Sequence, residues 1–171
     1  FHWVVGIFDY KNAGDVFENM PIVWTLADMN AFTGGCHYSE GCEGYTKECQ
    51  KCPLLSSDST LSHEAWKTKK ISYSKIKNLT IICPSEWMAE RVRKSSLFSG
   101  RAVHVIPNAF PTDQLKPANR IVARLRLGLP PNKRLIMFGA DSLASKRKGG
   151  DLLVSALHLL KQGHGRTDDI E

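Results

Sequence analysis

The sequence predicts an α/β fold built on parallel strands and incomplete at both ends. Apolar runs of strand length alternate along the chain with stretches of helical periodicity, and this alternation is typical of parallel sheets. The run "PIVWTL" at 21–26 is continuously apolar and β-branched, as strands buried on both faces tend to be. The 171 residues, of which 42% are hydrophobic and 23% charged, suit one globular domain or parts of two.

The first part of the chain contains most of the expected strands. We expect strands at 2–8, 21–26, 79–83 and 101–107, and helices at 59–76 and 84–98. Ser85 is the expected N-cap of the second helix, and Glu86 lies in its first turn, where an acidic side chain suits the helix dipole. Trp66 and Trp87 have helix-face spacing and are expected in the core, as is Cys83 at the end of a buried strand.

The second part begins with a polar, proline-bearing segment at 108–118, which is the expected linker between two domains. After it we expect a helix at 119–128, a strand at 133–139 and a helix at 151–163. The chain starts within an expected strand and stops where a new strand is due. The sequence therefore predicts an incomplete first domain at 1–107 and the start of a second at 119–171.

Charge is uneven along the chain. Residues 1–83 have 8 basic and 9 acidic side chains, a net charge of −1, whereas residues 84–171 have 15 and 8, a net charge of +7. A basic half favours an anionic partner such as phosphate, nucleic acid or a membrane surface, although a solvated lysine-rich surface explains it equally well. No apolar run reaches the roughly 18 residues that span a bilayer.

Four of the five cysteines fall in one loop at 34–53: Cys36, Cys42, Cys49 and Cys52. Three interpretations stay open, namely a structural zinc ion, two disulfides or free thiols. The two-residue gap of the last pair is common in zinc sites, and four thiolates would leave no open position for a substrate. The wider first gap is unlike the usual paired spacing, and His37 could replace one cysteine as a ligand.

Long segments of the chain resemble the group 1 (family 4) glycosyltransferases, in the branch that builds bacterial surface polysaccharides. They are "PIVWTLADMNAFTGGCHYSEGCEGYTKECQKCP", "TIICPSEWMAERVRKSSLF", "VHVIPNAFPTDQLKP" and "KRLIMFGADSLASKRKGGDLLVSAL". The resemblance implies a GT-B architecture of two Rossmann-like domains. It places 1–107 late in the N-terminal, acceptor-side domain and 119–171 at the start of the C-terminal, donor-side domain, so the chain would be an internal fragment.

The resemblance also implies an activity. Such enzymes transfer a sugar from a nucleotide-sugar donor to a glycan or lipid-linked acceptor, with retention of configuration and without a catalytic metal. No nucleic-acid partner is expected. The expected location is cytoplasmic, with peripheral contact to the inner face of the membrane as an alternative. The glycine-rich N-terminal loop and the spaced glutamate pair of the family are absent from this sequence, so the fragment alone is expected to be inactive.

The donor phosphates are expected at the segment "SKRKGG". The resemblance puts Lys148 on the diphosphate, and Lys146, Arg147 and Gly149 lie beside it where a helix begins. Cations there would stabilise the leaving pyrophosphate. Many relatives also have an arginine where this chain has Ala140, so Lys146 or Arg147 would have to compensate. A solvated basic surface is the alternative.

The segment "TLADMN" departs from its relatives, which often read Thr-Leu-His-Asp with the histidine facing the bound sugar. Ala27 stands in its place and can neither donate nor accept a hydrogen bond. An engineered change, a natural inactive variant and a subfamily that manages without the histidine are all open. Asp28 remains as a cleft-facing catalytic candidate or as a turn residue.

Two further pairs of residues are candidates for the cleft and hinge. Gly34 and Gly35 would let the loop approach an acceptor sugar, or would only make a tight turn. Pro107 and Asn108 would lie at the crossing between domains, or would form a simple proline turn. Two other functions compete with the transferase, namely a noncatalytic remnant and a zinc-clipped nucleic-acid-binding module.

Overall fold

The structure is a computed structural model, and it describes residues 1–143 and 145–163. The chain divides into two compact units, Phe1–Ala109 and a second that begins at Phe110. The boundary between them falls within the segment 108–118.

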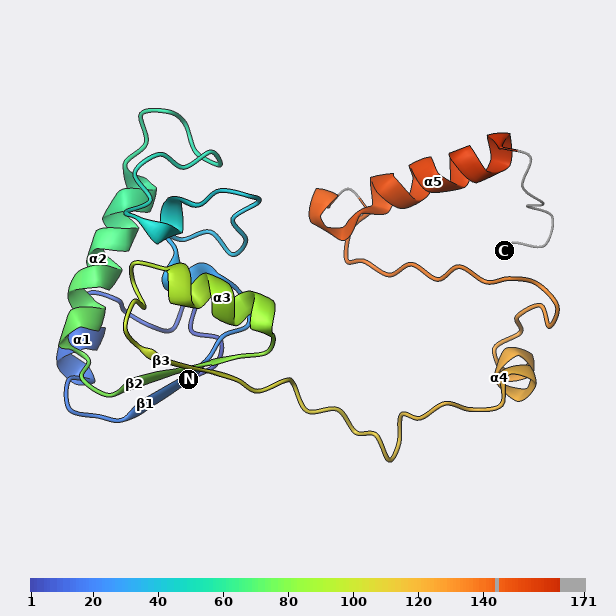
Figure 1. Cartoon of the computed structure of the whole chain (residues 1–171), viewed down its shortest axis with the longest axis horizontal. Coiled ribbons are helices and arrows are strands. Elements are labelled where there is room, and N and C mark those ends of the chain that lie inside the picture. The colour runs from blue at the N-terminus through green and yellow to red at the C-terminus, as the bar shows by residue number, and fades with distance from the viewer. Residues whose placement is uncertain (144, 164–171) are drawn as a thin grey trace. The chain divides into compact units, whose positions relative to one another are not determined.

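The first unit is built on a three-stranded parallel sheet with the order β1-β2-β3 (Figure 1). The strands are β1 (Ile22–Thr25), β2 (Leu79–Cys83) and β3 (Ala102–Val105). Parallel neighbours need a long crossover, and α2 (Leu61–Lys75) and α3 (Glu86–Lys94) provide the two crossovers. Three of the four strands expected in this unit are confirmed, and this α/β arrangement fits a Rossmann-like fold.

Shorter elements surround the sheet. Helix α1 (Ala13–Val16) packs against α2, and two 3₁₀ turns, η1 (Asn30–Phe32) and η2 (Gly44–Thr46), lie in the long segment between β1 and α2. The contact of α1 with α2 is close, because a Cβ atom on Gly14 would lie 2.6 Å from the carbonyl oxygen of Ser72.

One face of the sheet is buried. Ile22 pairs with Leu79 and Trp24 pairs with Ile81, and all four side chains are buried. Val23, which points to the opposite face, is 55% exposed. The expectation that β1 is buried on both faces was therefore wrong. Side chains alternate between the two faces along a strand, and the packed core covers only one face of β1.

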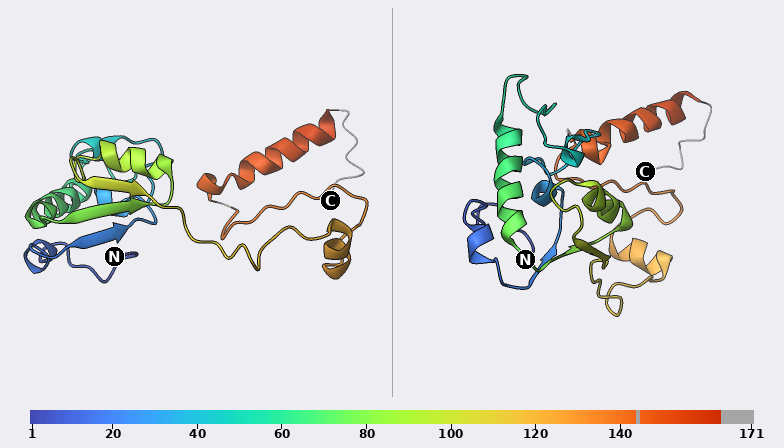
Figure 2. Two further views of the ribbon diagram at one scale, coloured as in Figure 1. Left: turned by 60° about the horizontal axis from the view of Figure 1, so that its bottom comes forward. Right: turned by 60° about the vertical axis from the view of Figure 1, so that its left-hand side comes forward.

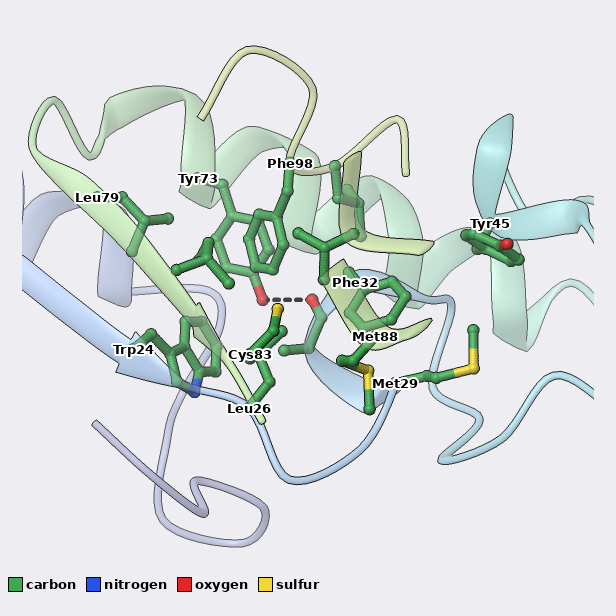
Figure 3. Packing of buried hydrophobic residues seen from close by; sticks show 14 of the residues in the cluster. Trp24, Leu26, Met29, Phe32, Tyr45, Tyr73, Leu79, Cys83, Met88 and Phe98 are labelled. Atoms are coloured by element: carbon green, nitrogen blue, oxygen red, sulfur yellow. Dashed lines mark hydrogen bonds between the residues drawn. The ribbon is translucent and has the colours of Figure 1, made fainter. Parts of the chain in front are cut away.

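The core is rich in aromatic side chains (Figure 3). The rings of Tyr73 and Phe98 stack at 5.1 Å, and Trp24 meets Tyr73 edge-on at 5.9 Å. Trp66 and Cys83 are buried in the same cluster, as expected. These contacts join β1, α2 and the segment after α3 into one hydrophobic core.

The N-terminal strand predicted at 2–8 is wrong. Within residues 1–8, Phe1 makes the backbone hydrogen bonds to β1: its amino group donates to the Val23 carbonyl at 2.7 Å and its carbonyl accepts from the Thr25 N–H at 2.8 Å. The His2 carbonyl accepts from the Trp24 side chain at 3.2 Å. The chain then turns, with Gly6 at a φ of 79°. An apolar run that turns away after one residue cannot continue the hydrogen-bonded ladder.

Helix α3 begins as predicted, since the Ser85 side chain accepts a hydrogen bond from the Met88 N–H at 3.3 Å. Trp87 was expected in the core and is 48% exposed instead. Its ring lies 4.3 Å from the Arg91 guanidinium carbon, a cation–π contact one helical turn away. Helix-face spacing alone does not show which face of a short helix is buried.

The second unit contains two of the predicted helices, α4 (Arg120–Arg126) and α5 (Gly150–Gln162), with the 3₁₀ turn η3 (Lys146–Lys148) between them (Figure 2). The Asn119 side chain caps α4 by accepting from two backbone N–H groups. The strand predicted at 133–139 is wrong. Within the described residues this segment forms no strand, and Arg134 makes only an isolated bridge.

Candidate functional site

The segments that follow the three strands leave the sheet at one edge. The Leu26 N–H, just after β1, donates to the Ile82 carbonyl at 2.9 Å, and the Ile106 N–H, just after β3, donates to the Cys83 carbonyl at 2.9 Å. Ligands of open α/β sheets bind beyond this carboxyl edge. The edge carries Asp28 after β1 and the exposed Pro107–Asn108 after β3.

Asp28 is 9% exposed, and both of its carboxylate oxygens are engaged. Oδ1 accepts from the Asn30 N–H at 2.8 Å, and Oδ2 lies 2.6 Å from Nδ1 of His37. The His37 side chain is 41% exposed, and its ring stacks on Trp3 at 5.4 Å. Asp28 is thus a turn residue and also one half of an acid–imidazole pair at the carboxyl edge.

Sequence reasoning found Asp28 but missed its partner. His37 was considered only as a substitute metal ligand, yet its Nδ1 faces the Asp28 carboxylate. The two residues are nine positions apart in an irregular loop, and no helical or strand periodicity relates them. The exposed Ala27 adds no polar group to this place.

A buried lysine lies next to this pair and was also missed. Lys69 is 3% exposed, and its Nζ donates to the carbonyl oxygens of Asn30 at 2.6 Å and Thr33 at 3.1 Å. It also lies 4.7 Å from the centre of the Tyr10 ring. Burial lowers the pKa of Lys69 to about 8, and the neighbouring Cys36 opposes this shift.

The sequence did contain a signal for Lys69. It occupies the buried stripe of α2, between Trp66 and Tyr73, at spacings of three and four residues. A lysine in such a stripe must find oxygen acceptors, because an unsatisfied buried ammonium group is costly. Asn30 and Thr33 provide these acceptors at the start of the cysteine-bearing loop.

We call residues 34–53 the cysteine loop. Its four thiols line one cavity of about 430 Å³, together with Gly34, Gly35 and residues of α2. The loop is attached to α2, since the Ser62 hydroxyl donates to the Cys49 carbonyl at 2.7 Å and His63 Nδ1 lies 2.9 Å from the Glu48 carbonyl. These two hydrogen bonds to α2 thus hold one side of the cysteine loop in a defined position.

Ser96 attaches the other side of the cysteine loop. Its N–H donates to the Tyr45 carbonyl at 3.1 Å, its hydroxyl donates to the Lys47 carbonyl, and it accepts from the Trp66 indole at 3.0 Å. A polar loop with few apolar side chains is in this way fixed to the core of the first unit.

Backbone N–H groups point at two of the thiols. The Gly34 N–H donates to Cys49 Sγ at 3.2 Å, and the Gly44 N–H donates to Cys42 Sγ at 3.3 Å. Burial raises the pKa of the Cys36 and Cys49 thiols. All five cysteines are free thiols, and among residues 1–143 and 145–163 no three His, Cys, Asp or Glu side chains are placed at metal-binding distances.

The two glycines at the start of the loop have different structural roles. A Cβ atom on Gly34 would lie 2.3 Å from the Ser62 carbonyl oxygen, so this position packs directly on the backbone of α2. Gly35 has a φ of 125°, which favours glycine, and its Cβ would meet nothing within 4 Å. Gly34 is therefore required for packing, and Gly35 for its backbone conformation.

The predicted phosphate-binding residues lie at the start of α5. Lys146, Arg147 and Lys148 form the exposed turn η3, and Gly149 is the N-cap of α5 with a φ of 71°. The Gly149 N–H donates to the Lys146 carbonyl at 3.1 Å. Three cations thus directly precede the N-terminus of a 13-residue helix. The strand expected before them is not formed.

Comparison with known proteins gives one relationship. Over 38 residues, 22% of this chain, the sequence is 47% identical to an Escherichia coli (strain K12) protein provisionally named colanic acid biosynthesis glycosyl transferase WcaC. The chain spans about 9% of the length of that relative. No protein-family model and no solved structure matches the chain.

Among the helices of the described residues, none combines the length and the apolar character needed to cross a membrane.

Proposed function

We propose that this chain is part of a retaining glycosyltransferase of GT-B architecture that acts in polysaccharide biosynthesis. The observation that carries the proposal is the 47% identity to the colanic acid glycosyl transferase. The parallel sheet agrees with it, because Rossmann-like domains are built on such sheets. The substrates proposed are a nucleotide-sugar donor and a glycan or lipid-linked acceptor.

In this proposal the turn before α5 binds the donor diphosphate. Lys148 contacts the phosphates, with Lys146, Arg147 and the N-terminus of α5 beyond Gly149 adding positive charge. Transfer of the sugar leaves a nucleoside diphosphate with added negative charge. Fixed cations at that place stabilise the transition state more than the ground state, and this difference accelerates the reaction.

The Asp28–His37 pair is the polar group proposed to face the sugar. Its imidazole lies at the carboxyl edge of the sheet, close to the position where relatives often have a histidine and this chain has Ala27. The buried Asp28 carboxylate orients the ring through Nδ1, which leaves Nε2 for a sugar hydroxyl. His37 in this way supplies an imidazole in place of the histidine that relatives often have where this chain has Ala27.

Donor binding tests the phosphate assignment. The 171-residue chain is titrated with UDP, GDP, TDP and their hexose conjugates, and binding is followed by ligand-detected NMR. We expect at least one nucleotide to bind, and Lys148→Ala to weaken it about tenfold or more, the equivalent of about 1.4 kcal/mol. Lys161→Ala is the matched control, since Lys161 is an exposed lysine at the far end of α5.

If no nucleotide binds, or if both variants weaken binding equally, the phosphate assignment fails. Transfer itself is tested by release of the nucleoside diphosphate in the presence of a lipid-linked acceptor. The anomeric configuration of the product, read from its NMR coupling constants, then shows retention or inversion.

A further inference from the structure

We propose that the cysteine loop is a structural zinc site in which Cys36, Cys42, Cys49 and Cys52 are the four ligands. The site goes beyond the transferase function and holds whether or not the chain transfers a sugar. Four cysteines complete a tetrahedral zinc shell, so the ion stabilises the loop and binds no substrate. Each cysteine loses its S–H proton to solvent as its Zn–S bond forms.

The loop brings the four thiols to one place. All four line the same cavity, although they come from three separate parts of the loop. Gly44 connects Cys42 and Cys49 through backbone hydrogen bonds. Its N–H donates to Cys42 Sγ, and its carbonyl accepts from the Cys49 N–H at 3.1 Å. Gly34 joins Cys49 to the beginning of the loop, two residues before Cys36.

The N–H groups that point at sulfur suit thiolates better than thiols. A thiol is a weak acceptor, whereas a metal-bound thiolate carries negative charge that backbone N–H groups stabilise. Two such donors, from Gly34 and Gly44, lie 3.2 and 3.3 Å from Cys49 Sγ and Cys42 Sγ. They provide the outer hydrogen bonds that orient ligands around a metal.

Charge gives an independent argument. Zinc with four thiolates has a net charge of −2, which is expensive to bury without a cation. Lys69 is buried beneath the start of the loop, where it holds the Asn30 and Thr33 carbonyls. Within residues 1–143 and 145–163 it forms no ion pair with a carboxylate. The Asp28 carboxylate acts on Lys69 without forming an ion pair with it, and an anionic loop would add the negative charge that this buried ammonium group needs.

The sulfur atoms must move together to reach the Zn–S distance of about 2.3 Å. Side-chain rotation and a small loop movement provide this, because Gly35 and Gly41 already have φ values of 125° and 88° and do not restrict the backbone as other residues would. His37 is not needed as a ligand, since four cysteines complete the shell and His37 is not among the residues that line their cavity.

Metal content tests the site. The 171-residue chain is purified without chelators, and its zinc and iron are measured by mass spectrometry. We expect one zinc per chain. After exchange with cobalt, we expect thiolate-to-cobalt charge-transfer bands and intense d–d bands, which report a tetrahedral site of four sulfurs. This spectrum requires no variant and is unaffected by folding defects of a variant.

Variants assign the ligands. Serine replacing any one of the four cysteines is expected to lower zinc affinity by more than the roughly 100-fold that loss of an outer hydrogen-bond partner costs. Cys83→Ala is the control, because Cys83 is buried at the end of β2, outside the loop, and one zinc should remain. Circular dichroism checks that each variant is folded.

Three results would overturn the proposal. The first is a chain without metal whose loop thiols react equally fast with and without added zinc. The second is a pair of disulfides, detected by mass spectrometry of the unreduced chain. The third is iron in place of zinc in the purified protein.

Discussion

The Nδ1 atom of His37 lies 2.6 Å from Oδ2 of Asp28, at the carboxyl edge of the sheet. The other oxygen of this carboxylate accepts the Asn30 N–H at 2.8 Å. One buried side chain therefore fixes both the turn after β1 and the position of an imidazole in the cysteine loop. Loss of Asp28 should affect stability as well as any chemistry at this edge.

Asp28→Ala is expected to lower the free energy of unfolding by about 2–3 kcal/mol, because it leaves a buried N–H and an imidazole without their charged acceptor. Asp28→Asn keeps an oxygen for the Asn30 N–H and should cost less. Urea denaturation followed by tryptophan fluorescence measures both. Asp58→Ala, at an exposed position of the same segment, should change stability by less than about 0.5 kcal/mol. Equal effects at the two positions would contradict the prediction.

Gly34→Ala is expected to destabilise the first unit by about 1–3 kcal/mol, the usual cost of overpacking. Its Cβ would lie 2.3 Å from the Ser62 carbonyl and 2.8 Å from Cys49 Cβ, and neither neighbour is the end of a flexible side chain. Thermal denaturation measures the effect.

Gly41→Ala is the comparison, because Gly41 lies in the same loop with nothing within 4 Å of its Cβ position. Its φ of 88° alone should produce a penalty of about 1 kcal/mol. The prediction for Gly34 fails if Gly34→Ala is the milder of the two changes, or if the cysteine thiols are equally accessible to reagents in both variants.

The parallel sheet could be predicted because its signals are local. β2 is a short β-branched run, and Ser85 stands where a helix N-cap belongs, so residue type and spacing were sufficient. The segment 2–8 is also largely apolar and forms no strand. A strand requires a hydrogen-bonding neighbour at its edge, and the composition of a segment does not show whether such a neighbour is present.

The candidate site was predicted only in part for a similar reason. Asp28 and the four cysteines were singled out, because the place of Asp28 after a predicted strand, its match to the relatives and the spacing of the cysteines marked them. His37 and Lys69 were missed, since each is defined by a partner that is distant in sequence, nine residues away for His37 and 39 for the Lys69 contact to Asn30. Tertiary contacts of this kind have no periodicity to detect.

Ser85→Ala is expected to cost about 1 kcal/mol, because the Ser85 hydroxyl accepts the Met88 N–H in the first turn of α3. Ser85→Asp should restore most of the loss, since a carboxylate is an equally good cap and suits the helix dipole. Ser74→Ala is the control, because the exposed Ser74 hydroxyl only donates to the Ile71 carbonyl within α2. Chemical denaturation of the three variants measures the differences, and a Ser74 effect as large as that at Ser85 would refute the capping role.

Lys69 makes stability depend on pH. Burial lowers its pKa from 10.5 to about 8, so between these values the unfolded chain binds the proton more strongly than the folded chain. The free energy of unfolding should therefore rise with pH from about 8 to about 10.5, relative to the variant Lys69→Met, by up to about 3 kcal/mol. Below pH 8 the difference between the two proteins should be constant.

The measurement is urea denaturation of the chain and of Lys69→Met across this pH range, in the presence of chelator and reductant. Lys67→Met is the control, because Lys67 is an exposed neighbour on α2 and should show no relative slope. A flat difference for Lys69 would show that its ammonium group is not desolvated in solution. With zinc bound, four thiolates near Lys69 stabilise its charged form, so the rise should move to higher pH. The same titration therefore tests the buried lysine and the charge of the loop above it.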